Sequence, residues 1–209
     1  MLSDTEQNIP DDGTLRISGR SLINAQTTSD VAASSIQSTA IVAIVILIML
    51  VSIHSFRQKD VQQGLARGFV SWIPLMMVVC WVYGIMGFTG YNINPQTVTI
   101  GALSLGLGVD YAVHFTTRLE EEVEHNPGGT QQEWVENASA TTGRAMFGAA
   151  LTTAGGFAVL NLSALLPLRL FGQAFVVAIT LALLSSLILI PAFYTKFLNR
   201  DAKKYLEEE

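Results

Sequence analysis

Residues 99–116 read TIGALSLGLGVDYAVHFT, a run of apolar, small and hydroxylated residues with one acid, Asp110, in its interior. Asp110 is also the only Asp, Glu, Lys or Arg between Arg67 and Arg118. If this run crosses a bilayer, an ionised carboxylate inside it costs about 2.5–3.5 kcal/mol. Chains rarely carry such a cost unless the acid has a partner or a function. Asp110 is therefore the first candidate for a functional residue.

The composition of the whole chain is that of an integral membrane protein. Of its 209 residues, 50% are hydrophobic and only 14% are charged, whereas a soluble domain usually carries about 25% charged residues. The stretches without Asp, Glu, Lys or Arg, together with the Asp110 run, approach the roughly 20 residues that a spanning helix needs. We therefore predict an all-α membrane protein, a bundle of five transmembrane helices at about residues 36–53, 69–88, 97–117, 143–163 and 168–194.

The polar segments predict the domain organisation. Residues 1–30 contain no signal peptide, but TLRISG at 14–19 alternates like a short strand, and 27–35 favours a polar helix that leads into the membrane. We divide the chain into a short extracytoplasmic segment (1–30), a five-span module (31–199) and a charged cytoplasmic tail (200–209).

Further patterns are expected to mark the ends of the later spans. The third span continues as a polar helix through 118–125 before NPGG breaks it, and an amphipathic helix over 131–140 follows on the membrane surface. Pro191 is expected to mark the end of the last span, and the tail after it is charged. Four acids of the polar extension are expected to form a solvated face: Glu120, Glu121, Glu122 and Glu124.

The Lys and Arg residues are distributed unequally between the two sides of this predicted bundle. Because positive residues accumulate on the cytoplasmic side, we predict a multi-pass plasma-membrane protein with its C-terminus in the cytoplasm and its N-terminal segment outside. A polar N-terminal segment without a signal is hard to place outside unless a span precedes it, so the chain is expected to be the C-terminal piece of a longer one. The nine residues on one side are Arg57, Lys59, Arg67, Arg118, Arg144, Lys196, Arg200, Lys203 and Lys204, and the three on the other are Arg16, Arg20 and Arg169.

Glycine is concentrated in the third and fourth predicted spans. Each Gly in a helix costs about 1 kcal/mol relative to Ala, so several in one span require a reason. Small residues let helices approach closely in lipid, where packing rather than hydrophobicity drives association. We therefore assign close helix packing to Gly101, Gly106, Gly108, Gly155 and Gly156.

Polar side chains define a candidate proton relay around Asp110. Tyr111 follows the acid directly, and His114 lies one helical turn beyond it, within side-chain reach. The tyrosine hydroxyl can hydrogen-bond either protonation state of the acid, whereas His114 is either a relay member or an orienting and packing residue. In the fourth span, Thr152 and Thr153 either bond to their own helix carbonyls or face Asp110 and bond to its carboxylate.

Other classes of function have little support in the sequence. The single cysteine, Cys80, excludes a disulfide within the chain, and the three histidines lie far apart, so neither a metal site nor a cofactor is expected. The sequence shows no pair of a nucleophile and a base that would indicate an enzyme. The sequence also shows no basic patch that would indicate binding to nucleic acid.

Three strings make the chain similar to a known family: GLGVDYAVHFTTRLEEE at 106–122, TTAGGFAVLNLS at 152–163 and LRLFG at 168–172. With Pro191 in the last span, they resemble the RND superfamily of transporters. The resemblance is to its MMPL branch of lipid and hydrophobe exporters, and it covers about residues 14–199. The corresponding five-helix block is called the sterol-sensing domain in eukaryotic relatives.

This resemblance implies the transmembrane module of a proton-driven exporter. Asp110 and Tyr111 match the proton-relay pair of that family, and Thr152 and Thr153 fall near hydroxyl positions of the next helix. Residues 1–30 resemble the last strand and exit of an extracytoplasmic porter domain that is otherwise missing. The implied partners are membrane lipids, protons, a lipid or hydrophobic substrate, the porter domain and a second, pseudo-symmetric transporter half. Without that half, this piece is not expected to transport.

Two other functions remain open at this stage. A sterol- or isoprenoid-lipid-sensing module without transport would use the same five-helix block and its small-residue groove, and Asp110 would then only complete a polar network. An assembly subunit would instead pair with another half through the third span.

Overall fold

The computed structural model describes residues 20–58, 61–90 and 99–208, and every regular element in them is a helix. The fold class predicted from the sequence, an all-α membrane protein, is confirmed. The elements are α1 (Arg20–Gln58), α2 (Val61–Phe88), α4 (Ile100–His125), α5 (Gln131–Ala138), the π turn η1 (Ser139–Gly143), α6 (Arg144–Ala158), the 3₁₀ turn η2 (Val159–Leu162), α7 (Leu166–Leu184), the π turn η3 (Ser185–Leu189) and α8 (Ile190–Glu208).

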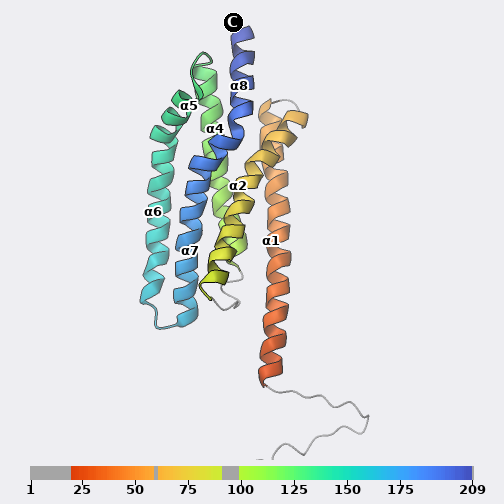
Figure 1. The fold of residues 1–209 in the computed structure, drawn as a ribbon, viewed down its shortest axis with the longest axis vertical. Coiled ribbons are helices and arrows are strands. Elements are labelled where there is room, and N and C mark those ends of the chain that lie inside the picture. The colour runs from red at the N-terminus through yellow and green to blue at the C-terminus, as the bar shows by residue number, and fades with distance from the viewer. Residues whose placement is uncertain (1–19, 59–60, 91–98, 209) are drawn as a thin grey trace, which may run out of the picture.

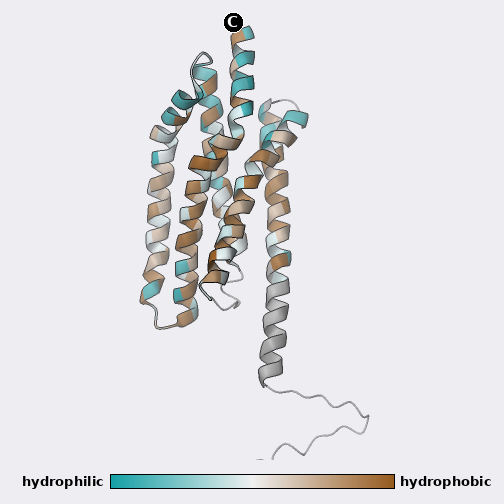
Figure 2. Cartoon of the chain, in the orientation of Figure 1, coloured by the Kyte–Doolittle hydropathy of each residue, from teal (hydrophilic) through white to brown (hydrophobic). Residues whose placement is uncertain are grey.

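The long helices lie side by side along one axis of the molecule (Figure 1). The end of α1, the start of α2, the short helix α5 and the last turns of α8 lie toward one end, which we call the charged end. The end of α2, the start of α4 and the turn between α6 and α7 lie toward the opposite end, which we call the hairpin end. Hydrophilic residues gather at the charged end, whereas apolar residues fill most of the middle of the helices (Figure 2). Helices that cross a bilayer show this distribution.

Four helical segments are long and apolar enough to cross a membrane, namely Ile36–Arg57, Val61–Phe88, Gln131–Leu162 and Leu166–Glu207. α4 is less apolar, since Asp110 and His114 interrupt its apolar run. It nevertheless runs from the hairpin end, where α2 stops, back to the charged end, where α5 leads into α6 (Figure 1). α4 therefore crosses wherever α2 and α6 cross, and it packs against α1, α2, α7 and α8.

Several local predictions are confirmed. Residues 27–35 belong to α1, and the polar residues 118–125 belong to α4, which ends before the NPGG turn. The amphipathic helix expected next is α5. It begins with a capping box in which Thr130 accepts a hydrogen bond from the Glu133 N–H and donates its own N–H to the Glu133 carboxylate. The strand predicted at 14–19 lies outside the described residues.

The helix continues past Pro191, the residue that the sequence predicts to mark the end of the last span. α7 continues through the π turn η3 into α8, which runs on to Glu208 with Pro191 in its first turn. Membrane helices tolerate proline where local π geometry and neighbouring groups satisfy the freed backbone groups. The charged residues 200–208, predicted to form a tail, are consequently the last turns of a packed helix.

Two glycines of α2 that the sequence reasoning did not single out bring α1 and α2 together. A Cβ atom added at Gly68 would lie 2.8 Å from the Val51 Cα atom, and one at Gly64 would lie 2.5 Å from the Ser55 Cα atom. A backbone atom cannot move out of the way as a flexible side chain can. Only glycine therefore allows the two helices this close approach.

Candidate functional site

One face of α4 is left uncovered by the other described helices, and Asp110 lies on it. Leu103, Gly106, Asp110 and His114 are exposed. They follow one another at intervals of three or four residues, which places them on one side of the helix. Three residues of the opposite side are completely buried: Ala112, Phe115 and Leu119.

Asp110 has no partner in the described part of the chain, where neither a hydrogen bond nor an ion pair reaches its carboxylate. Tyr111 is only 8% exposed and belongs to the core of the bundle. His114 shares the Asp110 face, and its ring is likewise without a hydrogen bond or ion pair among the described residues. The structure thus places the tyrosine of the predicted relay inside the bundle and the acid and histidine on its outer face.

The two threonines predicted to assist the acid bond to their own helix in this structure. The Thr152 hydroxyl donates to the Gly148 carbonyl and the Thr153 hydroxyl to the Ala149 carbonyl, each at 2.9 Å. Hydroxyls in membrane helices commonly bond back in this way. α6, which carries both residues, packs along α7. Neither hydroxyl bonds to Asp110 here.

The glycines predicted to pack helices fall into two groups. A Cβ atom added at Gly101 would overlap the Tyr83 ring, and one at Gly108 would lie 2.9 Å from the Leu75 Cδ2 atom, so both positions are closely packed. Three others have no atom within 4 Å of an added Cβ: Gly106, Gly155 and Gly156. Close packing within the described chain therefore accounts for Gly101 and Gly108 only.

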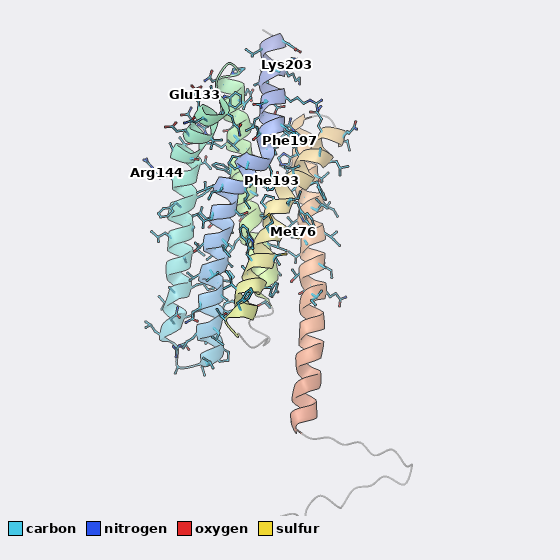
Figure 3. The ribbon with its side chains drawn as sticks, in the orientation of Figure 1. Met76, Glu133, Arg144, Phe193, Phe197 and Lys203 are labelled. Carbon is cyan, nitrogen blue, oxygen red and sulfur yellow. The ribbon has the colours of Figure 1, made fainter. Side chains whose placement is uncertain are left out.

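A second polar site, which the sequence reasoning missed, lies inside the bundle near the charged end. The guanidinium group of Arg67 is completely buried and donates two hydrogen bonds to the Asp201 carboxylate, at 2.8 and 2.6 Å. The same group donates a third, at 3.1 Å, to Glu120 Oε1. The centroid of the Phe197 ring lies 5.2 Å from Arg67 Cζ. Figure 3 labels Phe197 on α8. Arg67 therefore joins α2 to both α4 and α8.

Glu120 also forms a hydrogen bond or ion pairs with residues of α1 and α8. The Tyr194 O–H donates to Glu120 Oε1 at 2.6 Å. Arg57 Nε lies 3.1 Å from Glu120 Oε2, and His54 Nδ1 lies 3.7 Å from Oε1. Two arginines thus face two carboxylates, which balances charges that would be costly if buried alone. We call these residues the charge network: His54, Arg57, Arg67, Glu120, Tyr194 and Asp201.

The charge network corrects two expectations. The acids of α4 were predicted to form a solvated face, but Glu120 is 6% and Glu122 is 9% exposed. Asp201 was assigned to a charged tail, but it is buried against Arg67. The expectation was wrong because charges beside a span were assumed to face water. The only sequence signal is that Arg67 directly precedes a long charge-free stretch.

Asp110 and the charge network are separate sites on one helix. Ten residues separate Asp110 from Glu120, about 15 Å along an α-helix. Among the described residues, no group of three or more His, Cys, Asp or Glu side chains could hold a metal ion. A carboxyl group such as that of Asp110 can gain and lose a proton.

The sequence of this chain is similar to a known protein family and to several of its members. The model of the MMPL family matches residues 3–204. A protein of Methanocaldococcus jannaschii, named as a membrane protein, is 32% identical over 120 residues, which are 57% of this chain and 30% of that protein. MmpL12 of Mycobacterium tuberculosis, named as a probable transport protein, is 32% identical over 107 residues, which are 51% of this chain and 9% of that protein. The chain thus spans less than a third of the length of each relative. No solved structure matches it.

Proposed function

This chain belongs to the MMPL family, and on that premise we propose that it is the transmembrane module of an exporter driven by the proton-motive force. The cargo is a lipid or another hydrophobic compound, and Asp110 carries the proton within the membrane. Transport as the general function is supported by the family match and by relatives named as transport proteins. The direction, the cargo and the proton step are our proposal.

The observation that supports this proposal best is the position of Asp110 on an uncovered face of a membrane helix without a partner. An ionised carboxylate in contact with lipid costs about 2.5–3.5 kcal/mol. The cost falls if the acid is protonated, or if another protein surface covers the face. We propose that both occur: a second transporter half docks on the face of Leu103, Gly106, Asp110 and His114, and the acid is protonated in part of the cycle.

Proton binding then drives transport through a change in helix packing. Adding or removing one charge changes which arrangement of the helices has the lower free energy. Tyr111 and His114 flank the acid in the relay. Thr152 and Thr153 join it only in another arrangement of α4 and α6, since here their hydroxyls bond to their own helix.

The remaining parts of the proposal concern orientation. We assign the charged end to the cytoplasm, because the Lys and Arg residues flanking the spans gather there. The residues that precede α1 then lead to an extracytoplasmic porter domain, which selects the cargo and is moved by the helices.

The test measures export in the cells from which this sequence comes. Their chromosomal gene carries either the native sequence or Asp110→Asn. Two readouts are followed, the efflux of Nile red, a fluorescent hydrophobic dye, and the lipids released from the cell. We expect the Asn variant to match a deletion strain in both, at an unchanged amount of protein in the membrane. Glu136→Gln is the matched control, because Glu136 is exposed on α5, and it should export normally. Normal export by Asp110→Asn would remove the proton role and would favour a lipid-sensing module instead.

A further inference from the structure

We infer that the tip of the hairpin between α6 and α7 anchors the chain in the outer leaflet of the membrane, where its leucines enter the lipid and Arg169 binds the phosphate of a phospholipid headgroup. The tip comprises residues 162–169, which include the start of the LRLFG string at 168–172. The proton step uses no residue of this tip. Only the choice of leaflet rests on the proposed function, which assigns the hairpin end to the extracytoplasmic side.

The length of α6 places the tip at the edge of the hydrocarbon layer. α6 has 15 residues and η2 has 4, which together extend about 30 Å along the helix axis. The hydrocarbon core of a bilayer has this thickness. Arg144 is exposed at the start of α6 (Figure 3), and residues 145–168 contain no Asp, Glu, Lys or Arg. With Arg144 at one boundary of the hydrocarbon, the tip lies at the other boundary and not in the water beyond it.

The tip is apolar, although a turn in water usually carries polar residues. Leu162 is 86% exposed, and the other exposed leucines of the tip are Leu165, Leu166 and Leu168. The one hydroxyl of the connection, that of Ser163, already accepts a hydrogen bond from the Leu165 N–H at 3.1 Å. Exposed apolar surface of this kind marks contact with a membrane or with another protein. At the depth of the tip, the apolar surroundings are lipid.

Close packing of α6 and η2 on α7 holds the tip in one shape. A Cβ atom added at Gly172 would lie 2.7 Å from the Phe157 carbonyl oxygen, so only glycine allows this approach. The Gln173 side-chain amide donates to the Asn161 side-chain oxygen at 2.8 Å. The centroids of the Phe157 and Phe175 rings are 4.0 Å apart. The tip therefore presents its side chains to the lipid without rearrangement.

Arg169 is the one charged residue of this apolar tip, and it lacks an anion to pair with. It is exposed, and no hydrogen bond or ion pair of the described residues reaches its guanidinium group. Residues 61–109 and 145–195 contain neither Asp nor Glu, so no carboxylate of these spans balances its charge. An arginine at this depth extends toward the headgroups, and its planar fork matches the oxygens of a phosphate. Lipid phosphate is therefore the anion that fits this position.

The first part of the experiment measures the surroundings of the tip. The full chain is placed in vesicles of phosphatidylcholine and phosphatidylglycerol, and Cys80→Ser removes its single cysteine. Leu165→Cys then carries the fluorophore nitrobenzoxadiazole at the tip. Gly128→Cys carries it in the exposed NPGG turn at the charged end, as the matched control. Lipids with a nitroxide on the upper acyl chain quench a fluorophore in the membrane, and iodide quenches one in water. We expect lipid quenching to be stronger at the tip and iodide quenching to be stronger in the control.

The second part tests Arg169 with two nitroxide lipids at the same low mole fraction, one with a phosphatidylglycerol and one with a phosphatidylcholine headgroup. The choline cation competes with an arginine for the phosphate, whereas glycerol does not. We therefore expect the glycerol lipid to quench the Leu165→Cys label about fivefold more strongly, which is the effect of one cation near an anionic membrane surface. Arg169→Gln should bring this ratio close to one. Arg144→Gln removes an exposed arginine at the other end of α6 and should leave the ratio unchanged.

The outcomes separate lipid from water and from protein. Iodide quenching of the Leu165→Cys label without lipid quenching overturns the anchor, because the tip then lies in water. Absence of quenching by either agent also overturns it, because a protein surface then covers the tip. An equal ratio in the native chain and in Arg169→Gln overturns the phosphate site. If Arg169→Gln fails to insert, the native ratio decides, and a value near one overturns the phosphate site. All of these results leave the proposal for Asp110 standing, because neither proton binding nor export is measured.

Discussion

Asp110 and Glu120 are two acids on the same helix, α4, and they differ in both their exposure and their partners. Glu120 is 6% exposed and contacts side chains from three other helices. Asp110 is exposed and has no partner within the described chain. An acid that the fold satisfies contributes to holding the helices together. The exposed position of Asp110 without a described partner is the observation on which the proposed docking of a second half rests.

The largest effect should come from breaking the satisfied site. Arg67→Met leaves the Glu120 and Asp201 carboxylates facing each other without their shared cation, and breaking a buried pair typically costs about 3–5 kcal/mol. The free energy of unfolding, measured in detergent micelles, should fall by that amount. Arg118→Met is the control, because Arg118 pairs with Glu122 at a partly exposed site and should cost about 1 kcal/mol or less. Equal losses in both variants would show that the network does not hold the helices.

The next largest effect concerns two tyrosines, one at each site. Tyr194→Phe removes the O–H that donates to Glu120 at 2.6 Å, and a hydrogen bond to a charged group contributes about 1.5–3 kcal/mol. Tyr111→Phe should change the free energy of unfolding by about 0.5 kcal/mol or less, since the Tyr111 hydroxyl has no hydrogen bond among the described residues. Thermal unfolding of both variants in the same detergent checks the difference, and a reversed order would contradict it.

Two glycines of α4 extend the comparison to the covered and uncovered faces. Gly101→Ala places a Cβ atom 2.7 Å from Tyr83 Cε2, and such overpacking costs about 1–3 kcal/mol. Gly106→Ala meets no atom within 4 Å and should stabilise the isolated chain by up to about 1 kcal/mol through helix propensity. The melting temperatures of the two variants should therefore move in opposite directions. If both fall, the Gly106 face is covered by the chain itself.

The fold was predictable because its signals are local. Charge-free runs of the right length locate helices that cross a membrane, and turn residues such as NPGG locate the breaks between them. A local rule expects proline to end a helix, whereas the π turn at Ser185–Leu189 and the packing of α8 allow the helix to continue.

The candidate site was only half predictable, for a related reason. Asp110 is visible in the sequence because its neighbours carry no formal charge. The charge network is not visible, because Arg67 lies 53 residues from Glu120 and 134 residues from Asp201 along the chain. Each of these residues alone resembles an ordinary charge beside a span. Only the packing of α2, α4 and α8 brings them together.

The smallest effect, and the one that tests the comparison most directly, is expected from Asp110→Asn. This variant breaks no hydrogen bond or ion pair of the described chain, and an amide costs less in a membrane than an ionised carboxylate. The free energy of unfolding should therefore stay within about 0.5 kcal/mol of the native value or rise slightly. Glu120→Gln makes the same change of acid to amide in the charge network. There Arg57, Arg67 and Tyr194 lose the negative charge that they contact. That variant should lose more than about 1.5 kcal/mol. Both are measured by thermal unfolding in the same lipid nanodiscs, so that the apolar surroundings of Asp110 are kept. If Asp110→Asn destabilises the chain as much as Glu120→Gln does, then Asp110 is a structural acid, and its exposed position is no sign of a missing partner.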